Sequence, residues 1–219
     1  MALAETFRPD RRAWPFDRLG VLIALLAIGG ALTPFAAFRA NRIVPGMAVS
    51  LFATLPVWEV AIVCVVLLGA AVIAIVRVEP RLKLLVGLAA LVTLAFAIGD
   101  VASALTLEGD KISRTSPGTG FWVLGLAFAL MVSDAVARLK LRPWSRIGLL
   151  AGVVIVVGAI LYFGVWNDLS VLREYANRAD SFWREAATHV ALVLGSLVAA
   201  TVIGIPLGIV CHRVPKVRA

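Results

Sequence analysis

The chain has 219 residues, of which 61% are hydrophobic and 16% charged, with a formal net charge of +8 and a mean hydropathy of +0.97. This balance excludes an ordinary soluble domain, because a chain this short cannot surround so much apolar sequence with polar surface. The basic residues form no continuous patch, so nucleic-acid binding is not expected. The two cysteines, Cys64 and Cys211, belong to no CxxC motif, which argues against a metal site or a disulfide framework.

Six long apolar stretches follow one another along the chain, and a helix of about 20 residues covers the ~30 Å hydrocarbon core of a bilayer. A basic segment precedes the first stretch, as in a signal peptide. That stretch, however, extends for about 20 residues and residues 37–40 are a poor cleavage site, so we expect a retained helix. The sequence predicts an all-α, polytopic membrane protein with spans over residues 19–38, 57–76, 84–101, 121–136, 147–165 and 190–210.

Lysine and arginine concentrate on alternate connections between these stretches. Fourteen of the 21 lie before the first stretch, between the second and third, between the fourth and fifth, and after the sixth, whereas seven lie on the other connections. By the positive-inside rule, both termini are predicted to be cytoplasmic, and the longer connections 102–120 and 166–189 to face outward. The tryptophans agree, because their rings favour the headgroup level and all six flank the end of a stretch: Trp14, Trp58, Trp122, Trp144, Trp166 and Trp183.

Charged and histidine residues give no sign of proton transport or catalysis. Asp134 has Arg138 at i+4, a spacing that allows an ion pair, and Glu59 and Asp100 also lie within about a turn of a span end, so structural or snorkelling roles are expected. The two histidines, His189 and His212, fall near opposite faces of the membrane and cannot share a metal. The chain has no HExxH or GxSxG motif, and no enzymatic activity is expected.

Two of the connections predicted to face outward have distinctive sequence patterns. Residues 113–122 are rich in turn formers and no Lys-Ser/Thr pair follows their glycines, which predicts a structured loop rather than a phosphate cradle. Apolar residues recur at intervals of three and four over 167–188, which predicts an amphipathic helix in the outer interface, with Asp168 as its cap, before the chain turns inward at His189. This helix is either a connector resting on lipid or a docking surface for an extracytoplasmic partner.

The sixth stretch is built for close helix packing. Gly195 and Ser196 give one side a low profile, and Gly204 and Gly208 form a GxxxG step. Pro206 lies between these glycines and weakens the backbone hydrogen-bond ladder. We therefore expect these five residues to serve helix packing and gating.

This stretch resembles the first core helix of ABC-importer permeases, above all the osmoprotectant group. The resemblance rests on a His-x-x-Leu-x-x-x-Ser stretch, His189, Leu192 and Ser196, that continues into Gly-Ile-Pro-Leu-Gly at 204–208. Residues 41–46, 113–122 and 167–178 are similar to the Yeh-type branch, whose permeases carry an additional N-terminal membrane region. The family's Glu-Ala-Ala-x3-Gly coupling signature is not matched, because Glu185-Ala-Ala187 faces outward and position 191 is alanine.

The resemblance implies that the chain is the N-terminal portion of such a permease. Residues 1–166 would form an N-terminal membrane region with five spans, 167–188 the outer helix, and 189–219 the first core helix. The expected localisation is the cell inner membrane. The expected partners are membrane lipid, a second permease copy, an extracytoplasmic solute-binding protein and an ATPase, with ATP on that partner and no cofactor in this chain. Contacts with the outer partner, or with the solute entrance, are expected from Tyr175, Asn177, Arg178 and His189.

Under this interpretation the chain forms part of the passage for glycine betaine, choline or a related quaternary ammonium solute. Two alternatives remain. One is an accessory or scaffold subunit without a pathway, and the other is a small secondary carrier. The genomic sequence downstream would discriminate best, since further spans with the coupling signature support the importer. ATP-independent uptake driven by an ion gradient would instead identify a carrier.

Overall fold

A computed structural model describes residues 16–41, 43–107, 110 and 112–213. Seven basic residues and one tryptophan lie outside the described residues: Arg8, Arg11, Arg12, Trp14, Arg42, Lys111, Lys216 and Arg218. The chain divides into two compact units, with the boundary after Arg173, and each unit is described by itself.

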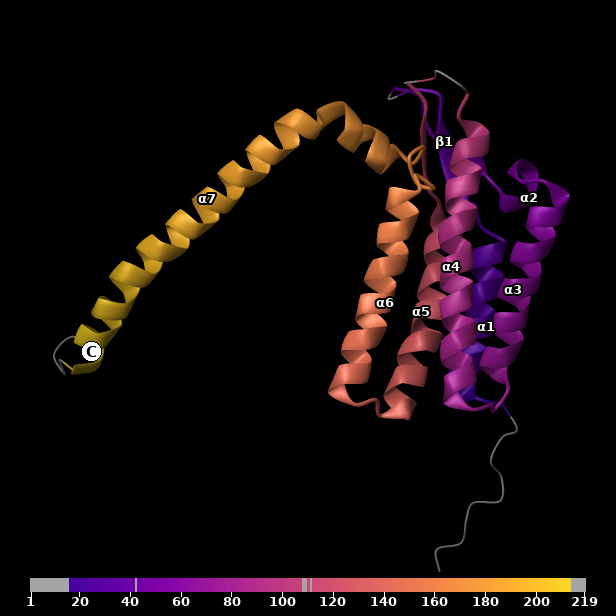
Figure 1. Cartoon of the computed structure of the whole chain (residues 1–219), viewed down its shortest axis with the longest axis horizontal. Coiled ribbons are helices and arrows are strands. Elements are labelled where there is room, and N and C mark those ends of the chain that lie inside the picture. Colours follow the sequence, from indigo (N-terminus) through magenta and orange to yellow (C-terminus); the bar gives the residue numbers. More distant parts are fainter. Residues whose placement is uncertain (1–15, 42, 108–109, 111, 214–219) are drawn as a thin grey trace, which may run out of the picture. The chain divides into compact units, whose positions relative to one another are not determined.

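The first unit is a bundle of helices (Figure 1). Proline begins two of them, in the first turn where its missing N–H costs nothing, and Lys140 ends another in a left-handed conformation with φ of 44°. The helices are α1 (Arg18–Ala31), α2 (Leu51–Thr54), α3 (Val57–Ile75), α4 (Pro80–Leu105), α5 (Thr119–Leu139) and α6 (Pro143–Tyr162).

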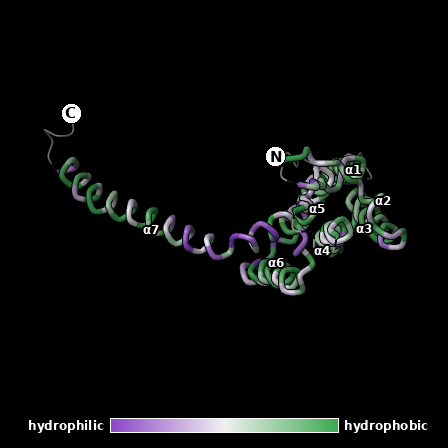
Figure 2. Tube along the Cα trace, turned by 90° about the horizontal axis from the view of Figure 1, so that it is seen from above, coloured by the Kyte–Doolittle hydropathy of each residue, from purple (hydrophilic) through white to green (hydrophobic). Residues whose placement is uncertain are grey.

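Small residues dominate the core between α1, α3, α4 and α5. Ala74, Ala90 and Ala127 are fully buried, and Phe128 and Leu94 are the largest of the fully buried side chains in the same core. Without a strong hydrophobic force between helices in lipid, small residues favour association because they let the backbones approach closely. Many exposed residues of the bundle are also apolar, and Figure 2 shows hydrophobic residues along its helices, as a surface in contact with hydrocarbon requires.

Among the described residues, five helices are long and apolar enough to cross a membrane: α3, α4, α5, α6 and the C-terminal α7 (Ser170–Arg213). The prediction of a span over 19–38 is wrong in its second half, because α1 ends at Ala31 after 14 residues, or about 21 Å. Thr33 and Pro34 follow. The Thr33 hydroxyl donates to the carbonyl of Gly30 at 2.9 Å, and proline cannot continue the helix.

A three-stranded antiparallel sheet takes the place of the missing helical turns. It consists of β1 (Ala36–Arg39), β2 (Met47–Val49) and β3 (Arg114–Pro117), in the order β2-β1-β3. In the centre of this sheet, Ala36 is opposite Val49 on one side and Pro117 on the other. The all-α prediction did not include this sheet. The region 113–122, predicted as a loop, contains both β3 and the start of α5.

The chain leaves α6 earlier than predicted. The expected span reached Val165, but α6 ends at Tyr162 and Gly164 adopts a φ of +75°, which breaks the helix. The turn that follows packs against α4. There the Trp166 indole N–H donates to the carbonyl of Ala95 at 2.7 Å, and a Cβ at Gly99 would lie 2.4 Å from the Val165 carbonyl oxygen.

In the second unit, the remainder of α7 consists of two helical segments that meet at a kink, where one residue is non-helical. That residue is Arg178, with φ of −129° and ψ of 15°, and the helix continues through His189. The predicted change of direction at His189 is therefore wrong. Asp168 is not the cap either, because α7 begins at Ser170. Figure 2 shows polar residues in the first turns of α7 and apolar residues beyond them.

Candidate functional site

The five residues predicted for helix packing lie on the exposed surface of α7, where no residue is buried. A Cβ added at Gly195, Gly204 or Gly208 would meet nothing within 4 Å, and the Ser196 hydroxyl donates to the carbonyl of Val193 at 2.9 Å. Pro206 lies inside the helix. The small residues thus leave an open, low surface on α7, and their role in packing stays a prediction.

The residues predicted to meet an outer partner do not form one cluster. The Trp183 indole N–H donates to the Tyr175 hydroxyl at 3.1 Å, and Arg178 pairs with Glu174 at 2.6 Å. His189 lies about 16 Å farther along the helix than Arg178, and its side chain is exposed, as is that of Asn177. The aromatic pair at 175 and 183 was not anticipated. Residues eight apart lie about 12 Å apart along a regular helix, so their spacing does not predict this contact, which spans the kink at Arg178.

Arg173, at the end of the first unit, fixes the loop that contains Asp110 and Ser113. Its guanidinium donates to the Ser113 carbonyl at 2.9 Å, to the Ser113 hydroxyl at 3.3 Å and to the carbonyl of Asp110. It also lies 3.8 Å from the Asp168 carboxylate. Ser113 is 1% exposed, so these bonds satisfy polar atoms that water does not reach. From the sequence, Arg173 was only one polar residue of the predicted amphipathic helix.

The carboxylate of Asp110 shapes the same loop. It accepts the backbone N–H of Ile112 at 2.8 Å and that of Ser113 at 3.1 Å. Hydrogen bonds from the Ser113 side chain and from these two N–H groups, with the charge of Arg173, lower the pKa of Asp110 to about 2. The Asp110 carboxylate and the Arg173 guanidinium together therefore fix the conformation of the loop.

A second ionic cluster joins four helix ends at the opposite end of the bundle. Asp17 accepts the Leu19 N–H as the N-cap of α1, and its own N–H donates to the Ile75 carbonyl at the end of α3 at 2.9 Å. Its Oδ2 accepts from Lys83 Nζ of α4 at 2.8 Å and from Arg138 Nη2 of α5 at 2.9 Å. We refer to Asp17, Lys83 and Arg138 as the Asp17 cluster.

Two members of the Asp17 cluster are buried. Asp17 is 8% and Lys83 4% exposed, and the Lys83 ammonium also donates to the Ala74 carbonyl at 2.8 Å. Burial alone raises the pKa of Asp17, but the hydrogen bond from Lys83 and the charges of Lys83 and Arg138 outweigh it, so the pKa lies below its ordinary value. The sequence alone places Lys83 among the loop charges and pairs Arg138 with Asp134 only. An aspartate directly before an apolar run was the available signal for a cap.

The predicted pairing of Asp134 with Arg138 is confirmed. Arg138 Nε lies 2.7 Å from Asp134 Oδ2, so this guanidinium bridges two carboxylates, one on its own helix and one at the start of α1. The bidentate fork of arginine suits such a bridge better than the single charge of lysine. A structural role accounts for Asp134.

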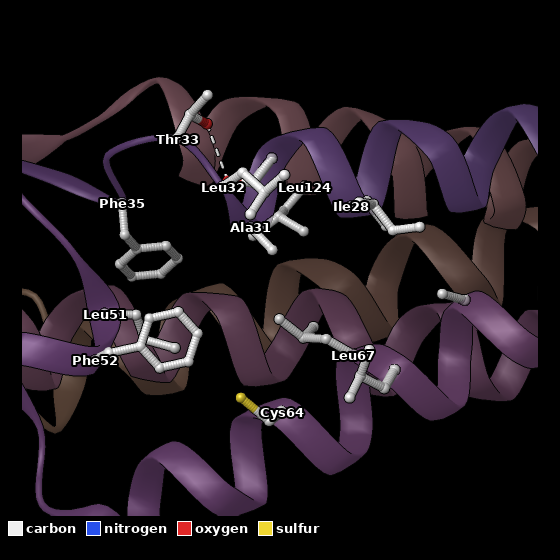
Figure 3. A pocket seen from close by; sticks show the side chains of 14 residues that line it. Ile28, Ala31, Leu32, Thr33, Phe35, Leu51, Phe52, Cys64, Leu67 and Leu124 are labelled. Carbon is white, nitrogen blue, oxygen red and sulfur yellow. Dashed lines mark hydrogen bonds between the residues drawn. The ribbon is translucent and has the colours of Figure 1, made fainter.

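An apolar cavity of about 250 Å³ lies between α1, α2, α3 and α5 (Figure 3). Phe35 and Phe52 are at one end and Leu67 and Cys64 line the α3 side. No lining residue is charged, and the Thr33 hydroxyl is bonded to its own helix end. The cavity therefore suits hydrocarbon, and it offers no group that would fix the carboxylate of a zwitterionic solute.

Residues 17–172 match the family described as ABC transporter permease YehY, N-terminal domain, so the match covers well over half of the chain. It begins at the Asp17 cap and ends next to Arg173, where the first compact unit also ends. Neither the curated proteins nor the solved structures contain a match. An ABC permease is a membrane transport component, not itself an enzyme, and in general works with an ATPase and a binding protein. The chain belongs to the Yeh-type ABC transporter permeases and carries their N-terminal domain.

Proposed function

We propose that the chain forms part of the solute passage of an ABC importer for osmoprotectants such as glycine betaine or choline. The importer would lie in the inner membrane, with a second permease copy, an ATPase on the cytoplasmic side and an extracytoplasmic binding protein. The observation that carries the proposal is the family match over residues 17–172. It favours a permease component over the scaffold and carrier alternatives.

The contrast between the two units supports a division of roles. The first unit has its own core of small residues and its own ionic clusters. α7 beyond Arg173 buries none of its residues, and its apolar side chains are exposed, since Leu192, Val198 and Ile205 are each more than half exposed. An apolar helix with a low-profile surface is suited to packing against other helices in a bilayer. We propose that it is the first core helix of the permease.

The proposal is tested by uptake in cells that lack other osmoprotectant importers. The native permease, ATPase and binding protein are expressed together, and entry of radiolabelled glycine betaine and choline is measured. Uptake that needs all three proteins and is abolished by an inactive ATPase supports the proposal. Uptake by the permease chain alone, driven by an ion gradient without ATP, would replace it with the carrier alternative. A complete complex that moves neither solute would refute the osmoprotectant assignment.

A substitution on α7 tests the role of its small residues. Gly204→Leu adds a large side chain where close packing is proposed, and uptake should fall at least tenfold, or the complex should fail to assemble. Ile203→Leu, one position earlier, conserves size and should leave uptake within about twofold. Normal uptake with Gly204→Leu would show that no helix approaches closely there.

A further inference from the structure

The helix α6 packs loosely against the rest of the first unit. Of its residues, Ile160 is the one that is buried. Between α4 and α6 lies a groove of about 400 Å³, to which α4 contributes Leu91 and Ala95 and α6 contributes Gly152 and Val156. Every residue that lines the groove is apolar. A space of this kind excludes water and accepts hydrocarbon.

The length of the groove corresponds to one leaflet of a bilayer. Along α6 the lining extends from Gly148 to Ile160, or about 18 Å, against roughly 15 Å for half of a ~30 Å hydrocarbon core. The two glycines keep the groove open, because a Cβ added at Gly148 or Gly152 would meet nothing within 4 Å. The groove can therefore accommodate one acyl chain that lies along the helix.

Positive charge gathers where the groove begins. Lys140 and Arg142 lie on the short connection from α5 to α6, and Arg146 lies in the first turn of α6. All three are exposed, none forms an ion pair with a residue that the structure describes, and the sequence has no acidic residue between Asp134 and Asp168. Figure 1 shows this connection at the same end of the bundle as the start of α4. Trp144, 81% exposed, lies within the same segment.

We propose that the first unit binds an anionic phospholipid at this place. One acyl chain occupies the groove between α4 and α6, and Lys140, Arg142 and Arg146 hold the negatively charged headgroup. Basic side chains at the cytoplasmic end of membrane helices are the usual partners of anionic headgroups, and an exposed tryptophan favours the same level of the bilayer. The three basic side chains favour an anionic lipid over an uncharged apolar molecule. The apolar groove favours the same lipid over free phosphate.

The headgroup contact is tested by lipid titration of the purified full-length chain in a neutral detergent, read by native mass spectrometry. Dioleoyl phosphatidylglycerol should bind more tightly than dioleoyl phosphatidylcholine, which has the same tails. Arg142→Gln with Arg146→Gln should weaken phosphatidylglycerol binding about 25-fold, at about fivefold for each charge. Arg77→Gln with Arg81→Gln removes one charge from the α3–α4 connection and one from the first turn of α4, and should change phosphatidylglycerol binding less than threefold. Equal loss in both pairs would show only general charge attraction and would overturn the site.

The acyl contact is tested independently of the charges. Gly152→Leu fills the groove and should abolish the preference for phosphatidylglycerol, whereas Gly125→Leu, at an equally open position on α5 outside the groove, should not. Gly148→Leu serves as a second filling variant if Gly152→Leu fails to fold. Dihexanoyl phosphatidylglycerol and inorganic phosphate should bind at least tenfold more weakly than the long-chain lipid. Unchanged binding in both filling variants, or dimers of the chain that disappear when the groove is filled, would overturn the proposal.

Discussion

At the scale of single residues, the stability of the bundle depends strongly on the Asp17 cluster. Asp17→Asn would leave the Lys83 ammonium buried without its counter-ion, and such a loss costs about 3 kcal/mol or more. Glu79→Gln is the matched control, because its pair with Arg81 at the same end is exposed at both side chains and contributes under ~1 kcal/mol. Thermal unfolding in detergent separates the two, and an equal effect would contradict a structural role for Asp17.

The same variant predicts a difference in acid stability. The pKa of Asp17 is lowered in the folded chain, so its stabilisation is complete above the ordinary aspartate pKa near 3.9 and is lost as the pH falls through the lower, folded value. As the pH falls from 5 to the lowered pKa of Asp17, the wild type should therefore lose stability faster than Asp17→Asn. Parallel curves of unfolding temperature against pH would show that Asp17 titrates alike in both states.

Arg173 is the second residue on which a local structure depends. Arg173→Gln loses most of the donors that satisfy Ser113 and the carbonyl of Asp110, so the backbone of residues 112–117 should open more readily. Hydrogen exchange should rise there at least tenfold while the core of α4 is unaffected. Arg184→Gln, an exposed position in the second unit, is the control and should change neither region.

At the scale of elements, α1 and α3 approach each other closely. A Cβ at Gly20 would lie 1.8 Å from the carbonyl oxygen of Ala74, so Gly20→Ala forces the two backbones apart and should destabilise the bundle by about 1–3 kcal/mol. Gly29 lies in the same helix with open space around it, and Gly29→Ala should be neutral or stabilise by up to ~1 kcal/mol. Unfolding temperatures that move alike would refute the close approach.

Sequence reasoning located the long helices because hydropathy is a local property. It placed their ends less well, since α4 begins at Pro80 and ends at Leu105, whereas the apolar stretch covers only 84–101. It missed the sheet because strands of three and four residues give little local signal, and because β1 and its partner β3 are far apart in the sequence. The Asp17 cluster was missed because its three members belong to the ends of three helices that are far apart in the sequence.

At the scale of the whole molecule, the two ionic clusters lie at opposite ends of the first unit. The Asp17 cluster is at the end where Lys and Arg are abundant in the connections, and the Arg173 contacts are at the end that carries the sheet. If the positive-inside rule holds, the first is cytoplasmic and the second external. The short α1 then covers only part of the hydrocarbon core, and β1 continues the chain outward.

Reporter fusions test this orientation. A cytoplasm-active reporter after Lys140 or Ala219 should be active, and an externally active reporter after Leu107 or Trp166 should be active, because these positions alternate across the predicted spans. The fusion after Ser50 is the most informative, since it depends on whether α1, with 14 residues, crosses the membrane. External activity there requires the crossing, and cytoplasmic activity would reverse the orientation of every later helix.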